Sequence, residues 1–186
     1  GELNRCIVRK NICSGTNSVG GGVRCTSGSM VKSCLITANS ATHYGGGMHC
    51  GSGATIENCT VVSNSTTAVA GGGTCGNSGG WFTNCVIYFN SPNDMTNIGT
   101  AYRYGYCCSS VDPGGQSNIT SNPLFADPSA GDYRLQAGSP CLDSGRNLNW
   151  MTNTTDLAGE PRIVRGGVDR GAYEFNAYPL SCSFTG

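Results

Sequence analysis

The chain has 186 residues, and its 11 basic and 11 acidic side chains balance to zero net charge. Charged residues make up 12% of the sequence, roughly half the usual share, which excludes a disordered charged tail and argues against a nucleic-acid-binding protein with a basic stripe. No apolar run approaches the roughly 20 residues of a membrane span, and the 29 glycines exclude a coiled coil or helical bundle.

Cysteine usage indicates the compartment. The sequence holds 12 cysteines, two histidines and no Cys-x-x-Cys pair, so zinc modules are disfavoured and a disulfide-permissive setting is favoured over a reducing cytosol. The chain starts at Gly1 without an initiator methionine, a start typical of a processed or excised piece. We therefore expect an extracellular or cell-surface location.

An internal repeat of about 25 residues predicts the fold of the first half of the chain. Cys6, Cys34, Cys59 and Cys85 each precede an asparagine by five positions. A second marker, a glycine run followed by a cysteine, gives Cys25, Cys50 and Cys75 at equal intervals of 25. The segments between turn residues alternate and are rich in β-branched residues, and they lack the leucine pattern of leucine-rich repeats. The repeat therefore predicts a β-helix with three short strands per turn.

Stacked turns lie about 4.8 Å apart, so equivalent residues are expected to form rows, or ladders, along the stack. The expected interior ladders are Leu3/Val31/Ile56/Phe82, Cys6/Cys34/Cys59/Cys85, Val8/Ile36/Val61/Ile87 and Cys25/Cys50/Cys75. Asn39, Asn64 and Asn90 are expected to pass side-chain amide hydrogen bonds from turn to turn. The glycine triplets allow positive φ and close backbone approach at a corner.

The sequence also resembles a known family. Residues 58–64, Asn-Cys-Thr-Val-Val-Ser-Asn, followed by a glycine triplet, resemble repeats of right-handed parallel β-helix proteins of the pectate-lyase-like superfamily, in the branch with polymorphic outer-membrane repeats. Motifs at 122–128 (Asn-Pro-Leu-Phe-Ala-Asp-Pro), 138–145 (Gly-Ser-Pro-Cys-Leu-Asp-Ser-Gly) and 168–175 (Val-Asp-Arg-Gly-Ala-Tyr-Glu-Phe) resemble the end of bacterial choice-of-anchor proteins. The resemblance implies an all-β, right-handed parallel β-helix in a secreted or surface-anchored protein, and no single activity.

Three segments follow from the repeat and the resemblance. Residues 1–111 are expected to form the β-helix coils, at about 25 residues per coil. Residues 112–175 are expected to form the C-terminal end of the β-helix and an irregular capping region. Residues 176–186 look like a linker or the start of a further surface module.

Carbohydrate cleavage is the enzymatic hypothesis for such a fold. Glycoside hydrolysis needs two carboxylates about 5–9.5 Å apart, and only Glu2, Glu57 and Asp94 fall within the first 100 positions. These three occupy different places in the repeat, so we expect no carboxylate cluster on a coil face and assign no catalytic residue. Polysaccharide binding or cleavage by a lyase or hydrolase, with its active site on coils upstream of Gly1, is the alternative.

The candidate ligand-binding residues are His43, Tyr44, His49, Tyr102 and Tyr104. The first three surround one glycine corner and can form a patch for a glycan or a protein partner, or simply a solvated turn. The two further tyrosines alternate with other residues, a pattern that fits either an aromatic platform for sugar or a cover over the last coil.

The tail carries the candidate metal ligands Asp143, Asp156 and Asp169. A calcium site needs six to eight oxygen ligands, so a structural calcium ion is conceivable, although no EF-hand spacing is present. The alternative is that these aspartates cap turns through their own carboxylates. No other cofactor is expected.

The cysteines allow two interpretations. Equivalent Cα atoms of neighbouring coils lie within the disulfide range of about 4.4–6.8 Å, and each cysteine can equally remain a buried free thiol. The disulfide candidates are Cys6 with Cys34, Cys59 with Cys85, Cys25 with Cys50, and Cys141 with Cys107 or Cys108.

These observations favour a non-catalytic structural or adhesive module outside the cell. The open first coil has unpaired strand edges, so end-to-end assembly into a fibre is expected. The expected partners are other copies or neighbouring modules of the same surface protein and glycans, with no nucleic acid and no membrane span.

Overall fold

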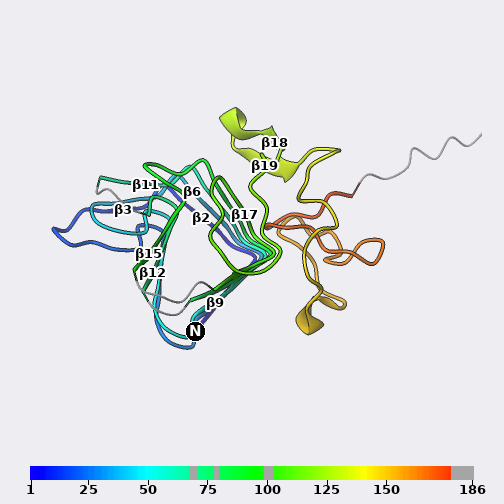
Figure 1. The fold of residues 1–186 in the computed structure, drawn as a ribbon, viewed down its shortest axis with the longest axis horizontal. Coiled ribbons are helices and arrows are strands. Elements are labelled where there is room, and N and C mark those ends of the chain that lie inside the picture. Colours follow the sequence, from blue (N-terminus) through cyan, green and yellow to red (C-terminus); the bar gives the residue numbers. More distant parts are fainter. Residues whose placement is uncertain (68–70, 78–79, 99–102, 177–186) are drawn as a thin grey trace, which may run out of the picture.

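The computed structural model describes residues 1–67, 71–77, 80–98 and 103–176. These residues form a parallel β-solenoid of about four turns with about 26 residues per turn, followed by a tail that lies against its side (Figure 1). The predicted all-β parallel β-helix is therefore confirmed. Tyr102 and the segment 177–186 lie outside the described residues.

Four parallel sheets run along the solenoid, where the sequence predicted three strands per turn. The first, called here the β1 sheet, contains β1 (Glu2–Asn4), β5 (Met30–Lys32), β9 (Thr55–Glu57), β13 (Trp81–Thr83) and β16 (Tyr104–Gly105). The β2 sheet contains β2 (Ile7–Arg9), β6 (Leu35–Thr37), β10 (Thr60–Val62), β14 (Val86–Tyr88) and β17 (Cys108–Ser109). The β3 sheet contains β3 (Ile12–Cys13), β7 (Ser40–Ala41) and β11 (Ser65–Thr66). The β4 sheet contains β4 (Val23–Cys25), β8 (Met48–Cys50), β12 (Thr74–Asn77) and β15 (Met95–Ile98).

The additional sheet is the β3 sheet, whose strands have two residues each. They follow directly on the corner that holds the asparagine ladder. The short run after each asparagine looks like a turn in the sequence, because two residues are too few to show an alternating pattern.

The predicted ladders of the β1 and β2 sheets have the expected register. Val31 pairs with Leu3 and Ile56, and Phe82 pairs with Ile56 and Tyr104. The ladder therefore extends one turn beyond the prediction, where the rings of Phe82 and Tyr104 stack with their centroids 4.8 Å apart. The Val8/Ile36/Val61/Ile87 ladder is confirmed in the β2 sheet.

One predicted ladder is wrong at its last position. Cys25 pairs with Cys50 as expected, but Cys50 then pairs with Gly76, while Cys75 pairs with His49. The glycine corner sets this register, because the N–H of Gly47 donates to the carbonyl oxygens of Gly72 and Gly73. A Cβ on Gly47 would lie 2.7 Å from the Gly73 oxygen, so the glycines must stay aligned and the cysteine shifts by one position.

The asparagine ladder forms as predicted. The side-chain amide of Asn39 donates to Oδ1 of Asn64 at 3.0 Å, and that of Asn64 donates to Oδ1 of Asn90 at 3.0 Å. The same row begins at Asn11 and ends at Asp94, whose Oδ1 accepts from Asn90 at 3.1 Å. Each amide thus satisfies buried polar groups of the next turn.

The corner between the β1 and β2 sheets uses left-handed backbone at residues other than glycine. Its equivalent positions in successive turns all have positive φ and are Arg5, Ser33, Asn58, Asn84 and Tyr106. Asparagine tolerates this conformation better than most residues. Two turns place Asn58 and Asn84 there, where their buried side chains also bind the tail.

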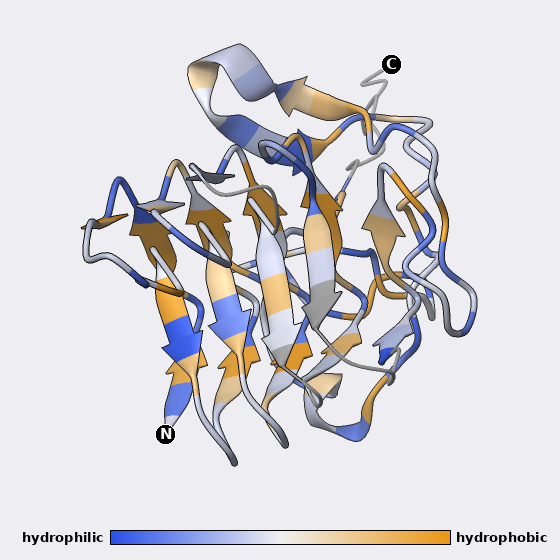
Figure 2. Cartoon of the chain, turned by 60° about the vertical axis from the view of Figure 1, so that its left-hand side comes forward, coloured by the Kyte–Doolittle hydropathy of each residue, from blue (hydrophilic) through white to orange (hydrophobic). Residues whose placement is uncertain are grey.

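The tail packs along the outer face of the β2 sheet. It contains β18 (Phe125–Asp127), η1 (Pro128–Ala130), the antiparallel partner β19 (Asp132–Leu135) and η2 (Asn149–Met151). Phe125, Tyr133 and Leu135 cover Leu35, Val62 and Val86 of the sheet. Figure 2 shows the hairpin lying across the side of the stacked coils.

Only a short part of the tail stacks on the end of the solenoid. Gln116 and Ile119 form parallel bridges with Gly105 and Cys108, which begins one further partial turn. The tail beyond it contacts the side of several turns, as the bonds from Asn58 to Asp169 and from Ala172 to Thr60 show. In the part of the chain that the structure describes, no helix is long and apolar enough to cross a membrane.

Candidate functional site

An exposed tryptophan marks the most distinctive surface of the solenoid. Trp81 begins β13, and 52% of its surface is exposed. Arg103 lies one turn further along, where its carbonyl oxygen accepts a 2.8 Å hydrogen bond from the N–H of Phe82. Its guanidinium carbon lies 4.7 Å from the centroid of the Trp81 ring, a cation–π contact that orients both groups.

Trp81 and Arg103 form part of a hollow of about 230 Å³, called here the Trp81 groove. Its other polar lining residues are Thr83, Tyr106, Gln116 and Arg146. The groove thus collects residues from β13, the start of β16, the partial last turn and the tail.

The backbone around the groove is held firmly. Oδ1 of Asn84 accepts a 2.7 Å hydrogen bond from the N–H of Arg146, and the Asn84 amide donates to the Arg146 carbonyl oxygen at 2.8 Å. Gln116 is fixed through its backbone, whose oxygen accepts from the N–H of Tyr106 at 2.8 Å. A rigid framework of this kind lowers the entropic cost of binding a ligand.

The groove is cationic. No aspartate or glutamate lines it, and within the described residues neither Arg103 nor Arg146 forms an ion pair. Arg146 is exposed and Arg103 is partly exposed. Both guanidinium groups are therefore available to donate hydrogen bonds to ligand oxygens.

A second tryptophan lies against the same sheet. Trp150 belongs to η2, and the Nζ of Lys32 lies 5.1 Å from its ring centroid. Glu57 pairs with Lys32 in register and is partly buried. Burial raises the pKa of the Glu57 carboxyl, while Lys32 and Trp150 oppose the change.

Sequence reasoning missed the Trp81 groove. In the repeat, Trp81 occupies the outward-facing position that Thr55 holds in the preceding turn. A large aromatic residue at an outward-facing position could have indicated a binding surface from the sequence. Arg103 was not found because the spacing changes in the last turn. Arg146 was not found because the tail has no repeat that would place it in space.

The predicted glycine-corner patch is only partly assembled. His43 and Tyr44 are partly buried neighbours with ring centroids 3.9 Å apart. His49 lies beyond the glycines in β8, stacked between Arg24 and Cys75. Its side chain is buried, and its Nδ1 has no hydrogen-bond partner among the described residues. Burial, and then the nearby Arg24, lower the pKa of His49.

The predicted tyrosine platform is not formed by Tyr104. This residue is 4% exposed and stacks inside the solenoid on Phe82, which matches the alternative of a cover over the last coil. Burial raises its pKa. Tyr106, two positions later, lines the Trp81 groove instead.

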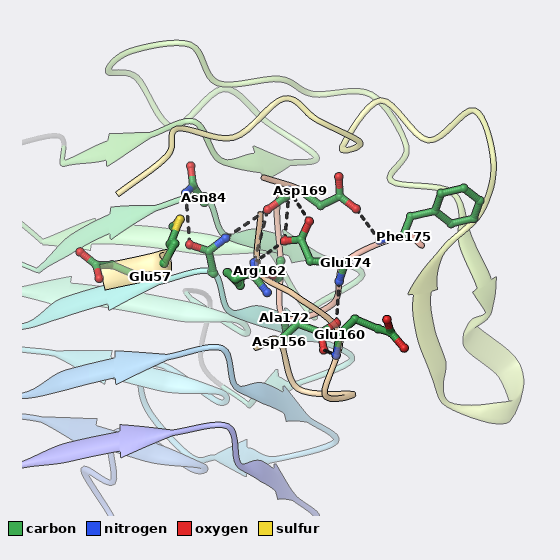
Figure 3. Close-up of polar contacts among 12 residues, drawn as sticks. Glu57, Asn84, Asp156, Glu160, Arg162, Asp169, Ala172, Glu174 and Phe175 are labelled. Atoms are coloured by element: carbon green, nitrogen blue, oxygen red, sulfur yellow. Dashed lines mark hydrogen bonds and ion pairs between the residues drawn. The ribbon is translucent and has the colours of Figure 1, made fainter. Parts of the chain in front are cut away.

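Two of the three predicted metal ligands, Asp156 and Asp169, hold the backbone of the tail (Figure 3). Asp156 accepts from the N–H groups of Glu160 at 2.8 Å and Glu174 at 2.7 Å. Asp169 accepts from those of Asp143 at 2.7 Å and Phe175 at 2.6 Å. Within the described residues, no group of three or more His, Cys, Asp or Glu side chains is arranged to hold a metal ion.

A buried contact between Arg162 and Glu174 completes this network. Arg162 is fully buried, and its Nη2 lies 3.3 Å from Oε1 of Glu174 and donates to the Gly171 carbonyl oxygen at 2.6 Å. Burial raises the pKa of Glu174 to about 8 although Arg162 opposes the change. These contacts link separate segments of the tail to one another. The hydrogen bond from Asn58 to the Asp169 carbonyl oxygen links the tail to the coils.

The predicted disulfides between coils are not formed. All 11 cysteines of the described residues are free thiols: Cys6, Cys13, Cys25, Cys34, Cys50, Cys59, Cys75, Cys85, Cys107, Cys108 and Cys141. In the ladder, Sγ of Cys34 donates to the Lys32 carbonyl oxygen at 3.0 Å, and Sγ of Cys59 donates to that of Glu57 at 3.3 Å. Each thiol is thus satisfied within its own turn and packs as a small apolar side chain.

Comparison with known proteins gives no relative. No protein-family model, no curated protein and no solved structure matches the chain. The function is therefore inferred from the solenoid and from the chemistry of the Trp81 groove.

Proposed function

We propose that this chain is a non-catalytic structural and adhesive module of a secreted or surface-anchored bacterial protein. In this proposal the solenoid is the rigid support and the Trp81 groove is the adhesive surface, which binds a glycan. The family resemblance of the tail motifs and the cysteine-rich, charge-poor sequence support an extracellular setting. The observation that carries the adhesive function is the exposed Trp81 ring with Arg103 lying over it.

The chemistry of the groove suits a sugar. The apolar C–H face of a pyranose ring packs against an aromatic ring, and Trp81 offers a partly exposed one. Gln116, Arg103 and Arg146 surround it with hydrogen-bond donors. An aromatic wall with a few fixed polar groups is the usual composition of a small-ligand site.

The test is a glycan-binding array followed by calorimetric titration of the glycans that bind. We expect Trp81→Ala to weaken binding at least tenfold without changing the unfolding midpoint, because half of the ring is already in solvent. Ile12→Ala is the matched control, since Ile12 is 79% exposed on β3, away from the groove. Equal binding by wild type and Trp81→Ala would contradict the adhesive assignment.

End-to-end assembly is a second element of the proposal. The first-turn strands β1, β2, β3 and β4 are each at the edge of a sheet, and edge strands are templates for pairing. A hollow of about 400 Å³ opens there, lined by Leu3, Val8 and Val23. We propose that a second copy of the chain stacks on this end.

Sedimentation velocity over a range of concentrations tests this assembly. We expect the wild type to associate and Val8→Lys to stay monomeric, with Ile12→Lys as the control that places the same charge on the outer surface. A wild-type chain that remains monomeric at high concentration would refute the stacking.

Polysaccharide cleavage is the alternative activity. It makes the same groove a substrate-binding surface and needs carboxylates or a base elsewhere in the protein. Incubating the protein with each bound polysaccharide and measuring new reducing ends or unsaturated sugars separates the two functions. A stable complex without products supports adhesion.

A further inference from the structure

We propose that the groove between the β18–β19 hairpin and the first two turns of the solenoid binds an acidic peptide segment of a partner protein. This hollow of about 400 Å³ is called here the hairpin groove. Ile7, Arg9 and Lys10 of the first turn line it, together with Leu35 of the second turn and Tyr133 of the hairpin. It shares no lining residue with the Trp81 groove, so the proposal is independent of glycan binding.

The hairpin groove continues a surface that the tail covers on the later turns. Ile7 lies in one row of the β2 sheet with Leu35, Thr60 and Val86. These three residues lie under the tail and are at most 4% exposed, whereas Ile7 is 54% exposed. The tail therefore covers this row from the second turn onward and leaves its apolar face open at the first turn.

Two cations take the place of neutral residues at this opening. Arg9 occupies the position that Thr37 holds in the second turn. Lys10 follows it at the left-handed corner that Ala38 forms in the second turn. Both side chains are exposed, and in the part of the chain that the structure describes neither forms an ion pair. Both can therefore bind an anionic group.

The described part of the chain supplies no carboxylate to these cations. No aspartate or glutamate lines the hairpin groove. The two acids of the neighbouring hairpin have other partners. Asp127 accepts from the N–H groups of Ser129 and Ala130, each at 3.1 Å, and Asp132 accepts from Nε of Arg134 at 2.9 Å. The groove thus carries uncompensated positive charge, and its complement is an anionic ligand.

The apolar floor of the groove favours a peptide over a sugar. Its most exposed apolar side chain is the branched Ile7, whereas Tyr133 is 6% exposed and Tyr173 is partly buried. The Tyr133 hydroxyl is already bonded to Ser63 at 3.0 Å. A pyranose packs on an open aromatic face, whereas an aliphatic side chain is stabilised by covering another one. The groove therefore fits an apolar side chain with carboxylates nearby, a combination that a peptide carries.

The geometry of β2 gives the spacing of these groups in the peptide. Ile7 and Arg9 point outward, while Val8 between them packs against the core. Residues two apart in a strand lie about 6.6 Å apart on the same face. An extended peptide lying along β2 that places an apolar residue over Ile7 therefore places a residue two positions away over Arg9 and the next one beside Lys10. The matching pattern is an apolar residue, one residue of any type, and two acids.

The experiment measures binding of the full chain to an immobilised peptide by surface plasmon resonance. The probe is acetyl-Glu-Glu-Ser-Leu-Ser-Glu-Glu, which carries the pattern in both chain directions, and the reference peptide has Gln in place of every Glu. We expect the wild type to bind the Glu peptide at least about tenfold more tightly than the Gln peptide, because the charge-assisted hydrogen bonds are lost in the reference.

Two pairs of variants locate the binding on the protein. Arg9→Gln should weaken binding of the Glu peptide about tenfold, while Arg5→Gln, which removes an exposed arginine of the same turn outside the groove, should leave it unchanged. Ile7→Ala should weaken binding several-fold, while Ile12→Ala should leave it unchanged, since Ile12 is exposed on β3. All four side chains are exposed, and circular dichroism checks that each variant is folded.

Three results would overturn the proposal. The first is a wild-type chain that binds the Glu and Gln peptides equally or binds neither. The second is an equal loss of affinity in Arg5→Gln and Arg9→Gln, which would show general attraction by the basic first turn. The third is binding of polygalacturonate that depends on Arg9 without binding of the Glu peptide, which would assign the groove to an acidic glycan.

Discussion

Replacing Asn64 tests how much the asparagine ladder stabilises the solenoid. This side chain is 1% exposed. Its Oδ1 accepts from the backbone N–H and the side-chain amide of Asn39, each at 3.0 Å. Its Nδ2 donates to buried oxygens, including the Ile36 carbonyl at 2.9 Å. Asn64→Ala therefore removes both the acceptor and the donor of the ladder in mid-stack.

The magnitude follows from the groups left without partners. Two buried donors of Asn39 lose their acceptor, and each unsatisfied buried group costs about 1–3 kcal/mol. We expect Asn64→Ala to lower the free energy of unfolding by about 3–5 kcal/mol, a large fraction of the roughly 5–15 kcal/mol of a typical domain.

Urea unfolding followed by circular dichroism measures this change. Asn11→Ala is the matched control, because Asn11 occupies the same row in the first turn, where it is exposed and its side chain donates one bond, to Asn39. The control should cost about 1 kcal/mol or less. Equal destabilisation by the two substitutions would refute the ladder as a source of stability.

Three further predictions concern the corner and the tail. Gly46→Ala should destabilise the fold by several kcal/mol in urea unfolding, because an added Cβ would overlap the carbonyl oxygens of Ser65 and Gly72. Gly15→Ala is the control, since Gly15 has open space around it, and should change stability by about 0.5 kcal/mol or less. Similar losses of stability in the two variants would contradict the corner geometry. Because the pKa of Glu174 is raised to about 8 from its usual 4.5, the folded chain binds more protons than the unfolded chain between those values. Stability should therefore fall as pH rises from 4.5 to 8, and Glu174→Gln should flatten this slope; an unchanged slope would exclude Glu174 as its source. Tyr133→Phe should cost about 1 kcal/mol through its lost hydroxyl contacts to Ser63 at 3.0 Å and Thr37 at 3.4 Å, and a loss above about 3 kcal/mol would show that the hydroxyl does more than these bonds.

The repeating part of the fold was predictable because residues at equivalent positions of the repeat lie next to each other in neighbouring turns. A residue such as Ile56 must lie between Val31 and Phe82 once the turns are in register. The prediction failed at Cys75, because aligning the glycine triplets and aligning the cysteines that follow them give registers that differ by one position. The glycine triplets determine the register, since their close backbone contacts leave no room for added atoms, whereas a cysteine fits either position.

The tail was predictable as a segment but not as a structure. Its aspartates accept hydrogen bonds from backbone N–H groups, as Asp169 does from those of Asp143 and Phe175. Such bonds leave no periodic signal in the sequence. The left-handed corners at Ser33 and Arg5 were equally invisible, since neither residue type favours that backbone conformation.

The same stacking explains where charged side chains gather on this molecule. In register, like charges on neighbouring turns lie about 4.8 Å apart and repel, so a regular solenoid keeps few charged side chains on its sheets. The charged groups of the Trp81 groove lie where the repeat ends. Arg103 directly precedes β16, the last short strand of the β1 sheet, and Arg146 lies in the tail. The regular turns supply the rigid Trp81 ring, and the irregular segments supply the two cations that surround it. In the proposed function, the binding groove lies beside the last turn because the stiff coils and the charged groups of the irregular segments meet there.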